Sequence, residues 1–264
     1  PIIFIEKEEE GMKVWRPHNY EGRFYGKTTL REALVHSRNT VTVRLLNKIG
    51  INYVISYAKR LGITSPLSSD LSLALGSSCV SLLELTTVYS VFANQGQYIK
   101  PIFITKIVDV HGHLLEENTP QPQSVINANT AYIMTNILAD VIKRGTGRRV
   151  KVFGRPAAGK TGTTNNYTDA WFIGYTPYYI TGVWVGYDDL KSLGEHEAGG
   201  RAAAPIWLYF MKKVEISLPV KPFFVPPNVI FAKMGSKIEC FPEKEKDLTQ
   251  EKDDLEIIYK ERDF

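Results

Sequence analysis

The spacing of apolar residues changes once along the chain, and this change limits the fold more than any other feature. Up to about residue 145 apolar residues recur at helical spacing, in segments that end at glycines. From 150 to 187 four short segments rich in β-branched and aromatic residues follow, separated by Gly, Pro, Asn and Asp. The gaps between these segments are too short for crossover helices, which favours antiparallel strands. The sequence therefore predicts an α+β fold, an antiparallel sheet flanked by helices.

Local signals place the individual elements. Ser81 and Glu84 form a capping box that opens a helix ending near Gly96, and Asn127 caps a helix that stops at Gly145. Residues 102–115 are typical of a hairpin, and a helix is expected at 202–214. The strands are expected at 150–153, 159–164, 170–175 and 179–187.

Residues 1–217 are interpreted as one domain, and residues 218–264 as a Pro-rich and then charged tail or linker. Four prolines lie between residues 219 and 227, and the sequence is mostly charged from Ser236 onward. Such a composition buries little apolar surface, so the tail is expected to be mobile from Ser236.

Composition excludes several classes of function. Hydrophobic residues make up 44% and charged residues 23%, which is typical of a globular protein. The formal charge of +4 is spread along the chain without a basic block, so no nucleic-acid partner is expected.

Asp109, His111 and His113 have the spacing of metal ligands, but the glycine between the two histidines favours a hairpin turn. Neither a metal nor a cofactor is expected.

Two short clusters can carry chemistry. Ser37-Arg38-Asn39 lies where one predicted helix ends and the next begins, and Lys160-Thr161-Gly162-Thr163 lies on a predicted strand. Such a strand offers a cation, hydroxyls and backbone N–H groups, while Gly162 allows a close approach. That combination suits an extended peptide ending in a carboxylate. By itself, each cluster also fits a plainer interpretation, a helix-capping turn for the first and an ordinary edge strand for the second.

A nucleotide-binding loop competes for the lysine segment. Residues 154–161 read GRPAAGKT and match the P-loop pattern G-x-x-x-x-G-K-[ST]. That loop must lead directly into a helix whose N-terminus holds phosphate. Residues 162–167, GTTNNY, form helices poorly, and the surrounding segments lack alternating strands and helices. The sequence therefore disfavours the P-loop.

Taken together, the two clusters resemble the motifs of the penicillin-binding proteins. They occur in that family's order about 120 residues apart, and the similarity runs from roughly Trp15 to Val214. Further segments resemble its class A, bifunctional branch: Arg16-Pro17-His18-Asn19-Tyr20, Thr29-Leu30-Arg31-Glu32-Ala33-Leu34, Arg144-Gly145-Thr146-Gly147, residues 169–177 (DAWFIGYTP) and residues 202–207 (AAAPIW). The resemblance implies a transpeptidase fold like that of the serine β-lactamases.

The chain departs from the family at the nucleophile, a serine in an S-x-x-K motif upstream of S-x-N. No serine precedes Ser37, and the one textual match, Ser56-Tyr57-Ala58-Lys59, comes after it. We therefore expect the nucleophile to lie upstream of this chain, with one or two strands of the sheet. On this interpretation residues 1–217 are the C-terminal part of a transpeptidase domain.

The resemblance implies a role for each site residue. An upstream serine would attack the penultimate D-alanine carbonyl of a peptidoglycan stem peptide, and β-lactams would acylate the same serine. Ser37, assisted by Lys160, would relay a proton to the leaving amine. Asn39 would bond the substrate amide and orient the nucleophile's lysine. Thr161 and Thr163 would bind the terminal carboxylate, with an oxyanion donor from the Thr163 backbone.

The resemblance also implies a setting. The parent protein is expected to carry a glycosyltransferase domain and a membrane anchor upstream and to act on the extracytoplasmic (periplasmic) face of the bacterial membrane. The chain begins at Pro1 and contains no apolar stretch near the ~20 residues of a spanning helix. Contact with the membrane is therefore expected only through the anchor, and the chain alone is expected to be inactive. The alternatives are a non-catalytic penicillin-binding sensor domain and the disfavoured P-loop hydrolase.

Overall fold

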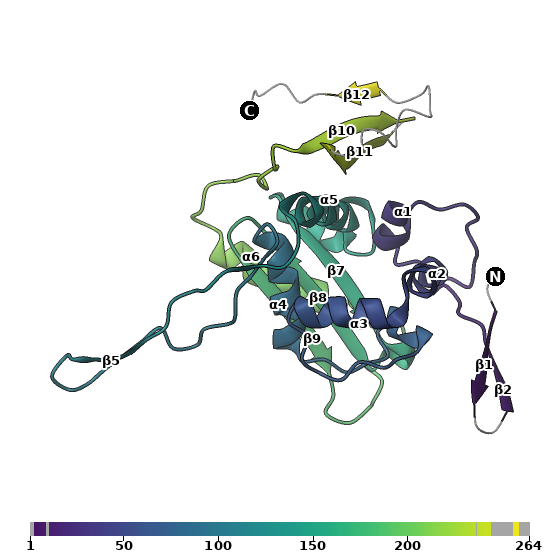
Figure 1. The fold of residues 1–264 in the computed structure, drawn as a ribbon, viewed down its shortest axis with the longest axis horizontal. Coiled ribbons are helices and arrows are strands. Elements are labelled where there is room, and N and C mark those ends of the chain that lie inside the picture. The colour runs from purple at the N-terminus through teal and green to yellow at the C-terminus, as the bar shows by residue number, and fades with distance from the viewer. Residues whose placement is uncertain (1–2, 9–10, 236, 244–255, 259–264) are drawn as a thin grey trace.

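A three-stranded antiparallel sheet forms the centre of the computed structural model (Figure 1). The sheet has the order β7 (Ala158–Thr163), β8 (Asp169–Tyr175) and β9 (Ile180–Gly186). Three of the four expected strands are thus confirmed, joined by short turns as the spacing predicts. The structure describes residues 3–8, 11–235, 237–243 and 256–258.

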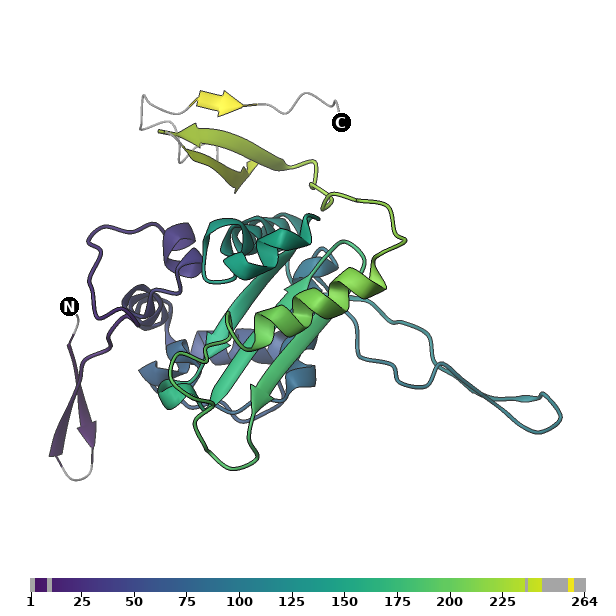
Figure 2. The same cartoon turned by 180° about the vertical axis from the view of Figure 1, so that it is seen from behind.

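Helices cover both faces of the sheet. On one face α5 (Ala128–Arg144) packs against β7, beside α4 (Leu82–Ala93), which packs against β9. On the other face lies α6 (Ala203–Val214), seen in front of the sheet in Figure 2. The α5 side buries Val35, Leu138, Val141, Ala158 and Tyr175, and the α6 side buries Ile142, Val150, Phe153, Ala157, Phe172, Ala203, Ala204, Trp207 and Met211. Because β8 contributes to both clusters, the sheet is buried on both faces.

Helix ends follow the sequence signals. The hydroxyl of Ser81 accepts a bond from the Glu84 N–H, and the Glu84 carboxylate accepts one from the Ser81 N–H, which confirms the capping box. Asn127 caps α5, which ends at Gly145 as predicted. Ahead of them lie three helices and a 3₁₀ turn: α1 (Leu30–Val35), α2 (Asn39–Ile49), α3 (Ile51–Arg60) and η1 (Leu71–Leu75).

Three short antiparallel pairs of strands, all earlier in the chain than the central sheet, lie outside this core. They pair β1 (Phe4–Glu8) with β2 (Gly11–Trp15), β3 (Gln97–Tyr98) with β6 (Gln123–Ser124), and β4 (Lys106–Val108) with β5 (Leu114–Glu117). The β4–β5 arm projects from the body (Figure 1). At its tip the Asp109 carboxylate accepts bonds from the His111 and His113 N–H groups, which confirms the predicted turn.

One predicted strand is wrong. Residues Arg148–Phe153, which include the expected strand at 150–153, form the 3₁₀ helix η2. Val150 and Phe153 are buried, whereas Val152 between them is 67% exposed. Burial three residues apart requires a helical turn, because a strand would bury alternate residues.

The C-terminal segment is more ordered than its composition indicates. Strand β10 (Val229–Met234) pairs with β11 (Lys237–Pro242) and β12 (Glu256–Ile258), and β11 packs against α5. Within the predicted tail, residues 237–242 form a strand whose Glu239 pairs with Arg31 of α1, and the interpretation of the segment as a mobile tail or linker stays a prediction. Residues 244–255 and 259–264 of the predicted tail lie outside the described residues. The boundary at 217/218 stays a prediction. In the described part of the chain, no helix combines the length and apolar character needed to span a membrane.

Candidate active site

Ser37 lies in an unusual backbone conformation at the end of α1. Its φ is +54°, in the left-handed region that favours glycine. The Ser37 N–H bonds to the Leu34 carbonyl at 3.2 Å and the Arg38 N–H bonds to the Ala33 carbonyl at 2.8 Å. This pair of bonds is the Schellman motif, which usually has glycine at the left-handed position. A serine there carries strain of about 1–2 kcal/mol, a feature that clusters at functional sites.

Lys160 of β7 reaches Ser37 from the sheet. Its Nζ donates to the Ser37 Oγ at 3.0 Å and to the Thr161 carbonyl at 2.9 Å. Burial disfavours the ammonium and lowers the pKa of Lys160 to about 8. No carboxylate of the described residues forms an ion pair with Lys160. The structure thus brings together the two residues, 123 positions apart, on which the interpretation of the sequence depends.

Thr161 and Thr163 follow Lys160 along β7, one and three positions later. The hydroxyl of Thr161 lies 2.7 Å from that of Thr146, just after α5. Thr163 accepts a bond at its Oγ1 from the Gly199 N–H at 3.1 Å. Gly199 lies so close to the sheet that a Cβ would come within 2.4 Å of the Gly162 carbonyl oxygen. In the described residues β7 pairs with β8 alone, so its other edge borders the site.

Thr146 was missed as a site residue by sequence reasoning. Its N–H donates to the carbonyl of Val35 at 3.2 Å, and a Cβ on Gly145 would lie 2.3 Å from the same oxygen. The ends of α1 and α5 therefore touch through backbone atoms. The signal was present in the segment Arg144-Gly145-Thr146-Gly147, which matched the family without an assigned role.

Asn39, at the start of α2, bonds to the segment that precedes α1. Its Nδ2 donates to the carbonyl of His18 at 2.9 Å. The neighbouring Asn19 is buried and accepts bonds at its Oδ1 from the N–H and the hydroxyl of Thr40, each at 3.2 Å. Arg38 pairs with Glu21 at 2.6 Å. The segment around His18 thus fixes the start of α2 and the position of Asn39.

The structure fits neither the P-loop pattern at residues 154–161 nor Ser56 as the serine of an S-x-x-K motif. Gly159, Lys160 and Thr161 of the P-loop pattern lie within β7, and the first helical turn after them is the three-residue η3 (Asn165–Tyr167). In the described structure the strand continues to Thr163, so no α-helix begins directly after the lysine to hold a phosphate. Ser56 of α3 is exposed and donates to the Tyr53 carbonyl at 2.8 Å. No described hydrogen bond joins Ser56 to Lys59.

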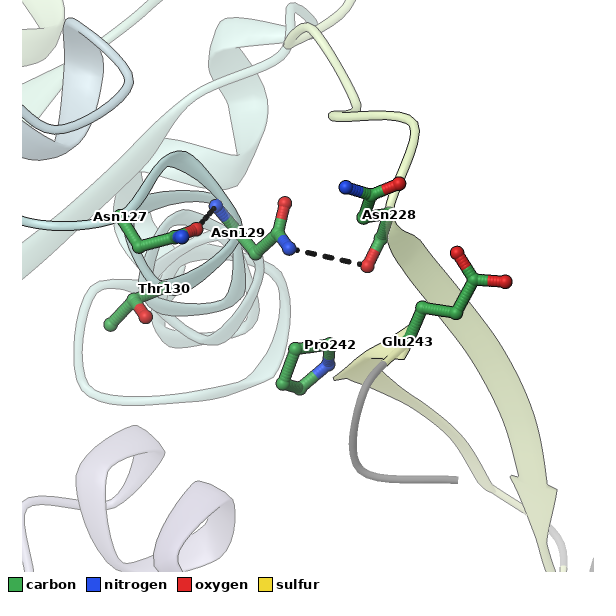
Figure 3. Close-up of a pocket in the computed structure, with 6 residues that line it drawn as sticks. All are labelled: Asn127, Asn129, Thr130, Asn228, Pro242 and Glu243. Atoms are coloured by element: carbon green, nitrogen blue, oxygen red, sulfur yellow. Dashed lines mark hydrogen bonds between the residues drawn. The ribbon is translucent and has the colours of Figure 1, made fainter. Parts of the chain in front are cut away.

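A polar pocket lies elsewhere, between the start of α5 and the C-terminal strands (Figure 3). Its volume is about 560 Å³, and the Asn129 side chain crosses it to the carbonyl of Asn228 at 3.3 Å. None of the residues of the Ser37–Lys160 site lines this pocket; its lining is Asn127, Asn129, Thr130, Asn228, Pro242 and Glu243.

An antiparallel sheet between helices, with an edge-strand lysine bonded to a serine at a helix junction, defines the transpeptidase/β-lactamase-like class of folds. The family model described as the penicillin-binding protein transpeptidase domain matches residues 3–212, and the chain belongs to this family.

Among relatives, the chain is 47% identical to penicillin-binding protein 1A of Aquifex aeolicus over 84% of its length and 36% identical to that of Pseudomonas aeruginosa over 87%. It spans 31% and 34% of those proteins. Among solved structures, penicillin-binding protein 1A of Haemophilus influenzae matches 91% of the chain with a TM-score of 0.84 at 26% identity, and the chain covers 43% of it. PonA1 of Mycobacterium tuberculosis, solved with penicillin V, matches 84% with a TM-score of 0.70 at 25% identity, and the chain covers 67% of it.

Proposed function

We propose that this chain is the larger part of a peptidoglycan D,D-transpeptidase domain that cross-links stem peptides through a serine acyl-enzyme. The observation that supports this best is the hydrogen bond from Lys160 to Ser37, made by a lysine whose pKa is about 8. Because general acids work best with a pKa near the working pH, this lysine is suited to proton transfer. The nucleophile is a serine on a segment upstream of the chain.

During acylation the lysine of the upstream nucleophile motif takes the proton of the serine hydroxyl. The serine oxygen bonds to the penultimate D-alanine carbonyl carbon, and the bond from that carbon to the terminal D-alanine nitrogen breaks. The leaving nitrogen takes a proton from the Ser37 hydroxyl, which takes one from the Lys160 ammonium. A stem-peptide amine then attacks the ester and forms the cross-link; its proton returns through Ser37 to Lys160, and the upstream lysine returns its proton to the released serine.

The edge of β7 that faces away from β8, together with the threonines of the strand, binds the substrate. An extended peptide ending in D-Ala-D-Ala lies along β7, with its carboxylate on the hydroxyls of Thr161 and Thr163. The Thr163 N–H donates to the oxyanion, and Asn39 bonds the substrate amide and orients the lysine of the nucleophile motif. β-Lactams occupy the same place; a relative of known structure, PonA1, was solved with penicillin V.

The whole protein extends beyond this chain. The chain spans about a third of the two curated relatives, which leaves room for other domains. We place a glycosyltransferase domain and a membrane anchor upstream and the catalytic domain on the extracytoplasmic face. Alone, the chain forms no covalent penicillin adduct, because it lacks the nucleophile.

Labelled penicillin tests the proposal in the full-length protein. Ser37→Ala and Lys160→Ala each lower the acylation rate at least tenfold, since proton relay contributes about 10²–10⁴-fold. Release of D-alanine from a D-Ala-D-Ala peptide then separates the enzyme from a binding or sensor domain without turnover. Unchanged acylation in both variants would refute the roles of Ser37 and Lys160, and a stable adduct on Ser56 of the isolated chain would refute the upstream nucleophile.

A further inference from the structure

A buried arginine joins α1 to two other elements. The guanidinium of Arg31, 6% exposed, pairs with Asp140 of α5 at 3.0 Å and with Glu239 of β11. Its Nη2 donates to the Asn136 Oδ1 at 2.8 Å. Burial alone would lower the pKa of Arg31, but the hydrogen bond and charge of Glu239, together with the charges of Asp140 and Cys240, outweigh it and raise this pKa above its ordinary value. The guanidinium is therefore held as a cation between two helices and a strand.

The helix that carries Arg31 cannot fix its own position. A helix of six residues is far below the length that is stable alone, so tertiary contacts must orient α1. Six residues after Arg31 the chain reaches Ser37, strained at φ +54°. A strained residue keeps its conformation only when the surrounding structure determines it. The contacts of Arg31 therefore help to decide where the Ser37 hydroxyl lies relative to Lys160.

Glu239, one of the two carboxylates that pair with Arg31, lies outside the family match. The transpeptidase model ends at residue 212, whereas Glu239 lies in the C-terminal sheet, above α5 and α1 in Figure 1. The Glu239 side chain is 18% exposed and that of Asp140 is 20% exposed, so both ion pairs are shielded from water. Removing one partner from a buried pair is costly, because the remaining charge is left uncompensated.

We propose that Glu239 and Arg31 are positioning residues, through which the C-terminal sheet sets the orientation of α1 and places Ser37 against Lys160. On this account the segment after residue 217 contributes to the catalytic domain by holding α1 in place. The inference rests on the role proposed for Ser37, but its test needs no turnover. A failure here therefore leaves the acylation experiment as an independent test of the function.

The test is the titration of the Lys160 ammonium by NMR in the full-length protein, with the signal assigned by its loss in Lys160→Arg. Ser37→Ala defines the pKa of Lys160 without the serine bond. Glu239→Gln moves the lysine pKa from the wild-type value toward that reference by about 0.3 unit or more, equivalent to about 0.4 kcal/mol. Glu239→Asp, which keeps the charge, moves it less.

A second buried ion pair supplies the matched control. Glu215, 1% exposed at the end of α6, pairs with Arg155 at 3.2 Å, and the described side-chain hydrogen bonds of both residues lead to Thr176 and to residues 215–219, not to α1. Glu215→Gln lowers the unfolding temperature but leaves the pKa of Lys160 at its wild-type value. The proposal is overturned if Glu239→Gln lowers the unfolding temperature without moving the lysine pKa, or if Glu215→Gln moves it equally. If Glu239→Gln does not fold, Glu239→Asp and Arg31→Lys provide the same comparison.

Discussion

Replacing Ser37 by glycine and by alanine separates the cost of its backbone conformation from the value of its hydroxyl. Both variants lose the bond from Lys160, so their difference in stability reports the backbone alone. At φ +54° a Cβ costs about 1–2 kcal/mol, whereas glycine loses about 0.5–1 kcal/mol more entropy on folding. Ser37→Gly is therefore expected to be more stable than Ser37→Ala by about 0.5–1 kcal/mol.

Urea unfolding of the two variants measures this difference through their midpoints, provided that the m-values agree. In thermal unfolding, 1 kcal/mol corresponds to about 2–4 °C for a domain of this size. In the full-length protein both variants should acylate at least tenfold more slowly than wild type, so glycine stabilises the fold without restoring function. An alanine variant as stable as the glycine variant would show that Ser37 is not strained.

Three further substitutions test the site and the fold. The folded pKa of Lys160, about 8, lies below its unfolded value of about 10.4, so the unfolded state binds more protons between these pH values. Wild-type stability relative to Lys160→Met should therefore rise by up to about 3 kcal/mol from pH 8 to 10.4 in urea titrations; a flat difference would contradict the buried ammonium. Gly199→Ala places a Cβ 2.2 Å from the Trp171 carbonyl oxygen and should cost about 1–3 kcal/mol by thermal unfolding; wild-type stability would refute this crowding. Hydrogen bonds from Ser65, Thr64 and Ser81 hold the pKa of Glu84 well below its ordinary value. Glu84→Gln should therefore be less stable than wild type by about 1 kcal/mol at pH 7 in chemical unfolding, and this difference should shrink as the pH falls below about 4. A loss of stability that does not depend on pH would contradict an ionised Glu84 at the cap.

Local signals in the sequence predict much of the fold because they act over a few residues. The caps at Ser81 and Asn127 and the strands of the central sheet depend on neighbours in the chain, and the structure confirms them. The strand predicted at Val150–Phe153 was wrong because a short run of β-branched residues fits a buried helical turn equally well. The order of β11 could not be predicted, since the partner of Glu239 lies 208 positions earlier in the chain.

The candidate site shows the same division. Local patterns placed Ser37 at a helix junction and Lys160 on a strand, but only the family resemblance linked two residues 123 positions apart. Neither spacing nor resemblance identified the left-handed φ of Ser37 or the bond between the hydroxyls of Thr146 and Thr161. Both features depend on how α1 and α5 meet, which is a property of tertiary packing. The roles of Asn39, Thr161, Gly162 and Thr163 in binding substrate stay predictions.

The backbone bond from Thr146 to Val35 gives this protein a built-in reporter of its site. An amide proton exchanges with deuterium only when its bond opens, and this one opens only when the two helix ends separate. Ser37 lies two residues beyond Val35, so the exchange rate of a single amide measures how often the Ser37 hydroxyl is displaced from Lys160.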